Sequence, residues 1–160
     1  MTSIDPTVDP GAFRERIREL GRAALTAAID RDLRTAAEHV RTAVTEYGPA
    51  GLSAVLLYFA DEMICHSYGG DHRPRRIQLI GFHEATGRIA PAPSAAAGWA
   101  ARLVETNATG DDDRVSAVLD ELTVDGATGV GERIGALLGM VAATMRGLPR
   151  GYMLIGAGHG

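Results

Sequence analysis

Glu62, His66, His72 and His83 are the residues whose types and spacing could support chemistry. Glu62 and His66 lie four positions apart, so on a helix they would share one face. Carboxylate and imidazole groups are ligands of zinc and non-haem iron sites, so this set could hold a divalent metal such as zinc. The chain has no His-Glu-x-x-His motif, and a Glu and a His at this spacing near a helix end also form an ordinary ion pair. A metal- or small-molecule-binding protein, including an enzyme, is therefore the alternative to the function predicted below.

A basic stretch, His-Arg-Pro-Arg-Arg, occupies residues 72–76. Its guanidinium groups could bind a phosphate or an acidic partner through paired hydrogen bonds. However, the whole chain has a formal net charge of -4. No aromatic residues stand between these arginines to stack on bases. We therefore do not expect nucleic acid as a partner.

Other catalytic patterns are absent from the sequence. It contains no Gly-x-Ser-x-Gly nucleophile motif, no phosphate-binding loop with a lysine and no dinucleotide fingerprint. Cys65 precedes His66, but neighbouring residues on a helix do not face each other, so they are a poor nucleophile–base pair. As the single cysteine, Cys65 also cannot form an internal disulfide. We predict no catalytic residues and expect that the chain is not an enzyme.

The elements that would position these residues repeat along the chain. At an offset of 78 residues, Gly48 matches Gly126 and Gly51 matches Gly129. After a gap of three residues, the pattern Pro-Arg-x-x-x-Leu-Ile-Gly occurs at 74–81 and again at 149–156. We predict an internal duplication within a single domain, 1–160. Its parts are half-repeat 1 at about 11–82, a linker at 83–94 and half-repeat 2 at about 95–157.

Within each half the apolar residues recur at three- and four-residue steps, which predicts helices. Asp9-Pro10 is typical of a helix start, Asp30 would cap a second helix, and Gly48-Pro49 would end it. Asp111-Asp112-Asp113 places negative charge where the second half begins a helix. The predicted fold is all-α, a six-helix bundle made of two three-helix units.

Glycines recur every four residues at 131, 135 and 139, within the last predicted helix. Glycine costs a helix about 1 kcal/mol relative to alanine, so three on one face favour close approach by a neighbouring backbone. Base composition alone could equally produce this stripe.

The two segments that follow helices three and six, 76–81 and 151–156, are apolar runs between turn residues. They are too short to favour helix, so each is predicted to be extended. Each could pack across its own helices, or the two could pair as a ribbon near a pseudo-twofold axis. Apolar side chains beside an arginine are typical of interface cores. The predicted partner-binding residues are Arg75, Leu79, Ile80, Arg150, Leu154 and Ile155.

The composition, 46% hydrophobic and 22% charged, is that of a globular protein. No apolar run reaches the length of a membrane span, and the polar start lacks a signal-peptide core, so a cytoplasmic protein without membrane contact is expected. We predict a non-catalytic helical interaction or scaffold protein that engages a protein partner or itself as an oligomer.

Overall fold

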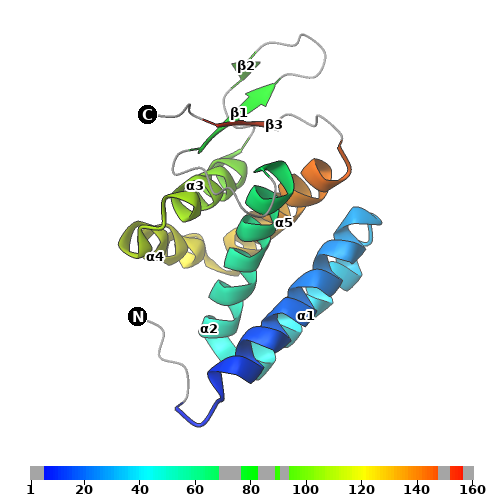
Figure 1. Cartoon of the computed structure of the whole chain (residues 1–160), viewed down its shortest axis with the longest axis vertical. Coiled ribbons are helices and arrows are strands. Elements are labelled where there is room, and N and C mark those ends of the chain that lie inside the picture. Colours follow the sequence, from blue (N-terminus) through cyan, green and yellow to red (C-terminus); the bar gives the residue numbers. More distant parts are fainter. Residues whose placement is uncertain (1–5, 69–76, 83–88, 91–93, 148–151, 157–160) are drawn as a thin grey trace. The chain divides into compact units, whose positions relative to one another are not determined.

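A computed structural model describes residues 6–68, 77–82, 89–90, 94–147 and 152–156. Helices dominate, which confirms the predicted fold class, and three short strands accompany them (Figure 1). The chain divides into two compact units, Met1–Phe59 and Ala60–Gly160. Within the described ranges, no helix is both long and apolar enough to cross a lipid bilayer.

The first unit begins with α1 (Pro10–Ile29), which starts as the sequence predicts. The Asp9 side chain accepts hydrogen bonds from the backbone N–H groups of Gly11 and Ala12, at 3.2 and 3.3 Å. These N–H groups have no partner within the helix, so the carboxylate satisfies them. Proline at the first helical position costs nothing because its missing N–H would be unpaired there anyway.

The second helix, α2 (Leu33–Tyr68), is capped by Asp32 and not by Asp30 as predicted. Asp32 accepts hydrogen bonds from the backbone N–H and the hydroxyl of Thr35, at 3.0 and 2.7 Å. Both bonds lower the pKa of Asp32, and the bond from the Thr35 hydroxyl has the larger effect. Asp30 instead ends α1, where its N–H donates to the carbonyls of the last turn. The prediction failed because Arg31 adopts a positive φ of 65°, which delays the start of α2 by two residues.

Five α-helices are found in the described residues, one fewer than the six predicted. The helices expected on either side of Gly48-Pro49 form one element, α2, with non-helical backbone angles at Gly48 (φ 63°, ψ -147°). Glycine adopts a positive φ at little cost, so the chain can change direction there without an intervening loop. The predicted interruption of the helix at Gly48-Pro49 is observed as a bend within α2, and the predicted count of six helices is not confirmed.

Contacts between α1 and α2 hold the first unit together. Arg16 donates two hydrogen bonds to the carboxylate of Glu46, at 3.0 and 2.7 Å. The rings of Phe13 and Tyr47 meet edge to face, with centroids 4.8 Å apart. Buried apolar residues, including Ile17, Leu20, Val40, Leu56 and Phe59, form the interior.

The helices of the second unit follow from similar local signals. They are the end of α2, α3 (Ala95–Thr109), α4 (Asp112–Asp120), the short 3₁₀ helix η1 (Glu121–Thr123) and α5 (Gly126–Met145). Asp111 caps α4 by accepting from the N–H of Arg114, and Asp112 and Asp113 lie in the first turn, as predicted. Packing of α3 against α4 and α5 buries Trp99, Leu103, Val104, Leu137 and Val141.

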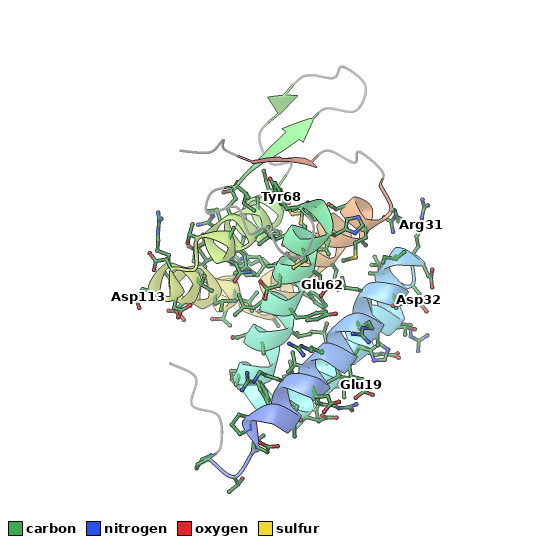
Figure 2. All side chains as sticks on the ribbon, in the orientation of Figure 1. Glu19, Arg31, Asp32, Glu62, Tyr68 and Asp113 are labelled. Atoms are coloured by element: carbon green, nitrogen blue, oxygen red, sulfur yellow. The ribbon has the colours of Figure 1, made fainter. Side chains whose placement is uncertain are left out.

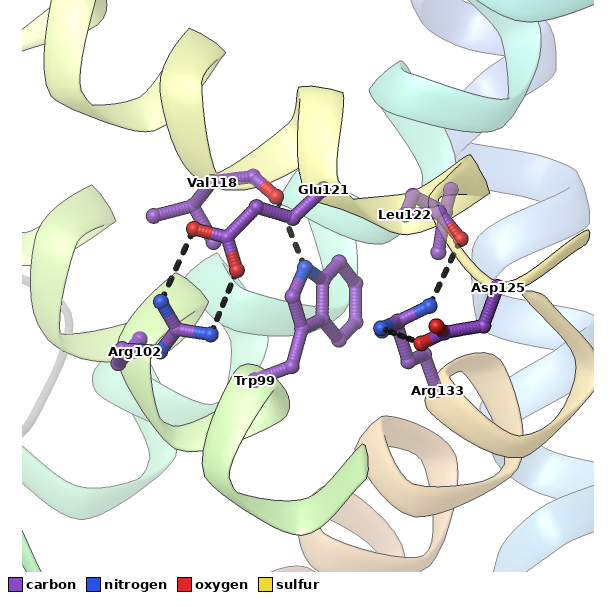
Figure 3. A network of polar contacts seen from close by, with 7 residues as sticks. All are labelled: Trp99, Arg102, Val118, Glu121, Leu122, Asp125 and Arg133. Carbon is purple, nitrogen blue, oxygen red and sulfur yellow. Dashed lines mark hydrogen bonds and ion pairs between the residues drawn. The ribbon is translucent and has the colours of Figure 1, made fainter. Parts of the chain in front are cut away.

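A buried arginine joins α5 to η1 in this unit (Figure 3). Arg133 is only 9% exposed, and it donates to the Leu122 carbonyl at 3.1 Å and to the Asp125 carboxylate at 2.5 Å. Beside it, the Trp99 indole donates to the Val118 carbonyl at 2.8 Å. These contacts tie down the short connection between α4 and α5 and satisfy the two terminal nitrogens of the buried guanidinium, whereas its Nε has no hydrogen-bond partner among the described residues.

Two pairs of glycines have closely similar surroundings. Gly48 and Gly126 both have a positive φ, 63° and 69°, and Gly51 and Gly129 each follow three residues later. A Cβ at Gly51 would overlap the carbonyl oxygen of Ala43 and lie 2.9 Å from the Cβ of Tyr47, and one at Gly129 would lie 2.6 Å from the Cβ of Asp125. In both places the sharp bend brings the residue before it close to the new helix, so only glycine fits.

The glycines at 131, 135 and 139 are different. All three are exposed, and a Cβ built at any of them would meet no other atom within 4 Å. The close approach predicted from their spacing is therefore absent from the described part of the chain.

Candidate functional site

The segments with the repeated Leu-Ile-Gly pattern form strands of one small sheet. These strands are β1 (Ile77–Phe82), β2 (Ile89–Ala90) and β3 (Tyr152–Gly156), in the order β2-β1-β3 (Figure 1). Both pairings are antiparallel. Of the two arrangements that the sequence left open, the paired ribbon is the one observed.

The register of β1 with β3 is symmetric about Leu79 and Leu154. The pairs are Ile77 with Gly156, Gln78 with Ile155, Leu79 with Leu154, Ile80 with Met153, and Gly81 with Tyr152. Leu79 and Leu154 hold the same position in the repeated pattern, since each is the leucine of its Leu-Ile-Gly. The two copies of the repeated pattern therefore pair with their equivalent leucines opposite each other, and the strands run in opposite directions from this point.

Glu105 of α3 ties β1 to the helices. Its side chain is half-buried, and its Oε1 accepts a hydrogen bond of 2.7 Å from the Leu79 N–H. Nearby on α3, the Asn107 amide donates to the Asp61 carboxylate of α2 at 2.8 Å. Ile77 is buried, at 7% exposure, and Leu79 is half-buried. Thus α3 holds both the end of α2 and the sheet.

The hydrogen bond from the Leu79 N–H to Glu105 also shows which way the backbone N–H and C=O groups of β1 and β3 point. Opposed residues in an antiparallel pair alternate between exchanging two hydrogen bonds and directing their N–H and C=O groups away from each other. Because the Leu79 N–H points to Glu105, we infer that Leu79 and Leu154 are a non-hydrogen-bonded pair, whose N–H and C=O groups point away from each other. The backbone groups of Tyr152, Leu154 and Gly156 are then directed toward the outer edge of β3.

The two outer edges of the β1–β3 ribbon differ. On β1, Gly81 and Phe82 of the outer edge pair with β2. The N–H of Leu79, on the same edge, donates to the Glu105 carboxylate. On β3, the outer edge pairs with no strand that the structure describes. An unpaired strand edge presents N–H and C=O groups that can pair with another chain.

Comparison with protein-family models, curated proteins and solved structures finds no match. We use the name "β3 edge" for the outward backbone groups of Tyr152, Leu154 and Gly156.

Only two of the four predicted metal ligands, Glu62 and His66, lie in the described residues. Glu62 is half-buried and His66 is exposed on the last turns of α2, with no hydrogen bond or ion pair between them (Figure 2 labels Glu62). His72 and His83 lie outside the described residues. Within the described ranges, no three His, Cys, Asp or Glu side chains could share a metal ion. The four-residue set remains a prediction.

Tyr68 is the other polar group of note near the end of α2 (Figure 2). Its hydroxyl oxygen is buried and has no hydrogen-bond partner among the described residues. Burial disfavours the charged phenolate, so it raises the pKa of Tyr68. This single group does not form a site.

The predicted partner-binding residues have different outcomes. Leu79, Ile80, Leu154 and Ile155 lie in β1 and β3, where their backbones pair within the chain. Arg75 and Arg150 lie outside the described residues. The strands were therefore placed correctly, but their role in binding a partner remains a prediction.

Sequence reasoning missed Glu105 and Arg133. Arg133 stands three residues after Val130 and four before Leu137, so it falls on the apolar face of α5. That position signals a buried charge and could have identified it. No local pattern identifies Glu105, because its partner is a backbone N–H 26 residues away.

Proposed function

We propose that this chain is a protein-interaction module that accepts an extended segment of a partner protein along the β3 edge. The observation that carries the proposal is the difference between the two outer edges of the sheet. One edge is covered by β2 and Glu105, and the other has no partner strand among the described residues. A non-catalytic binding role fits a site made of backbone groups.

Strand addition uses groups that every protein segment carries. The partner supplies N–H and C=O groups that complete the ladder, and its alternate side chains supply selectivity. The sequence of β3, Tyr-Met-Leu-Ile-Gly, has no proline and no charged residue. Proteins that avoid edge-to-edge pairing usually place lysine, proline or a bulge on such a strand. The composition of β3 therefore favours pairing.

We also propose that the two halves of the chain arose by duplication. The symmetric pairing of Leu79 with Leu154 supports this, because equivalent residues meet at the centre of the ribbon. The matching bends at Gly48 and Gly126 support it independently, since they fall at the same offset as the sequence identities. On this view β3 is a second copy of β1 whose outer edge is available to a partner.

Proline substitution on the β3 edge tests the proposed function. Leu154→Pro removes the outward N–H while leaving the alternating hydrogen bonds to β1 in place. Leu154→Ala is the matched control, because it shortens the side chain and keeps the N–H. The tagged full-length chain would be purified from the cells that naturally produce it and weighed by native mass spectrometry.

We expect part of the wild-type and Leu154→Ala samples to carry a second protein chain, and Leu154→Pro to lose it. Gly156→Pro, which removes another outward N–H, should give the same loss. Circular dichroism would establish that the proline variants keep the helical content of the wild type. Equal complexes in wild type and in both folded proline variants would contradict the proposal.

A further inference from the structure

We infer that the segment that pairs with the β3 edge is β3 of a second copy of this chain, in antiparallel orientation. This inference rests on the proposed function and names the partner. It predicts a symmetric dimer with a continuous sheet in the order β2-β1-β3-β3-β1-β2. Six strands lie within the usual size of a sheet.

The first reason is that the repeated segment already pairs with its own copy. The β1 and β3 strands share the Leu-Ile-Gly pattern, and they pair antiparallel with leucine opposite leucine. The structure thus contains an example of this segment accepting, in reversed direction, a segment that shares its Leu-Ile-Gly pattern. A second β3 offers the outer edge the same kind of partner.

The second reason is the symmetry of the outward backbone groups. The groups at Tyr152, Leu154 and Gly156 are centred on Leu154, so a twofold axis at Leu154 would place them opposite the same groups of the other copy. Leu154 would then face Leu154 of the second copy, and each Tyr152 would face a Gly156. Such a pairing makes about six backbone hydrogen bonds, two for each facing pair.

The third reason is electrostatic. In a symmetric strand pair a charged residue on the axis would face its own copy, and one beside the axis would lie diagonal to its copy, so like charges would come close, which is destabilising. The five residues of β3 carry no charge, so a second copy meets no such penalty within the strand. A strand of five residues buries little surface, so we expect the dimer to be weak and dependent on concentration.

Analytical ultracentrifugation of the purified full-length chain would test this. The weight-average mass of the wild type should rise from one chain toward two as its concentration increases, and Leu154→Ala should behave alike. Leu154→Pro and Gly156→Pro should remain at the mass of one chain, with wild-type helical content by circular dichroism.

Disulfide trapping tests the register. With the native Cys65 changed to Ser, Leu154→Cys would place two thiols on the axis, with Cα atoms about 5.5 Å apart, inside the range that a disulfide spans. Oxidised glutathione would accept the two electrons as the bond forms. Met153→Cys is the control, because Met153 would face Ile155 of the other copy and not itself. We expect several-fold more covalent dimer from Leu154→Cys than from Met153→Cys.

Two results would overturn the inference. A wild-type chain that stays at the mass of one chain at every concentration, and gives no covalent dimer, has no second copy on the β3 edge. If that chain still carries a different protein that Leu154→Pro loses, the proposed function stands and only the second copy fails. A dimer that survives both proline substitutions uses another surface, which also overturns the inference.

Discussion

At the scale of single residues, Arg133 is a buried charge within the described residues of the second unit. Its guanidinium is buried, whereas the carboxylate of its partner Asp125 is 64% exposed. An exposed carboxylate stabilises an ion pair only slightly, but its removal leaves a buried cation with fewer partners. Removing an exposed partner of a buried charge can therefore lower stability more than the exposure of that partner suggests.

We expect Asp125→Ala to lower the free energy of unfolding by about 1–2 kcal/mol, below the range for fully buried pairs because Asp125 is exposed. Asp120→Ala is the control, since Asp120 is exposed and lies near the end of α4, and it should leave stability nearly unchanged. Urea unfolding of the full chain measures both. Equal effects of the two substitutions would contradict a special role for Asp125.

Asp32 should make stability depend on pH. The hydrogen bonds from Thr35 lower the pKa of Asp32 in the folded state, so the folded chain releases this proton more readily than the unfolded chain does. The contribution of Asp32 is then fully present above the unfolded pKa, and it is lost as the pH falls through the folded pKa.

Asp32→Asn tests this, because asparagine can still cap a helix but does not titrate. The stability difference between the wild type and this variant should shrink as the pH falls from about 5 to 2. Thermal unfolding across this range measures the difference. A constant difference would show that the ionised carboxylate contributes nothing.

At the scale of elements, the bend at Gly48 divides α2 and the bend at Gly126 begins α5. Each bend brings the Cβ of the preceding residue close to a second glycine, at 51 or at 129. The exposed glycines of α5 have no such neighbour. One substitution should therefore have opposite effects at different positions.

Gly51→Ala and Gly129→Ala should each destabilise the chain by about 1–3 kcal/mol, because the added methyl group overlaps neighbouring atoms. Gly135→Ala should stabilise it by about 0.5–1 kcal/mol, since alanine favours the helix and meets open space. Melting temperatures of the three variants compare these effects. A gain in stability at position 51 or 129 would mean that the bends are looser than described.

Glu105 is the contact that joins α3 to the edge of β1. Glu105→Ala should leave the Leu79 N–H without its acceptor and lower the local opening free energy by about 1–2 kcal/mol. Glu105→Gln keeps an acceptor oxygen and should retain most of the protection. Hydrogen exchange of the Leu79 amide measures both variants. Unchanged exchange in Glu105→Ala would rule out this bond as a support of the sheet.

At the scale of the whole molecule, the net charge predicts how salt affects the proposed dimer. Each chain has a formal net charge of -4, so two copies repel each other. We expect the dimer on the β3 edge to strengthen as salt rises from about 0.05 to 0.5 M, because screening weakens this repulsion while backbone pairing changes little. Ultracentrifugation at several salt concentrations measures the trend. A dimer that weakens with salt would depend on attraction between opposite charges.

The sequence by itself determined much of the local structure. Apolar periodicity indicated helices, Asp9 and Asp111 marked two of their starts, and Gly48-Pro49 marked the place where the helical backbone of α2 is interrupted. These features depend on residues within one or two helical turns of each other, so a linear pattern contains the necessary information. The repeated pattern also identified both segments that became paired strands.

Only the tertiary structure decided how those segments pair and which contacts their backbones make. Residues far apart in the chain had to meet before Leu79 could lie opposite Leu154 and before Glu105 could take a backbone N–H of β1. The same holds for Arg133, whose burial depends on the packing of α5 against η1. Strand register and edge exposure are set by such long-range contacts, because the backbone groups involved are the same in every residue. That is why the sequence could indicate both segments, whereas only the fold showed which strand edge has no partner strand among the described residues.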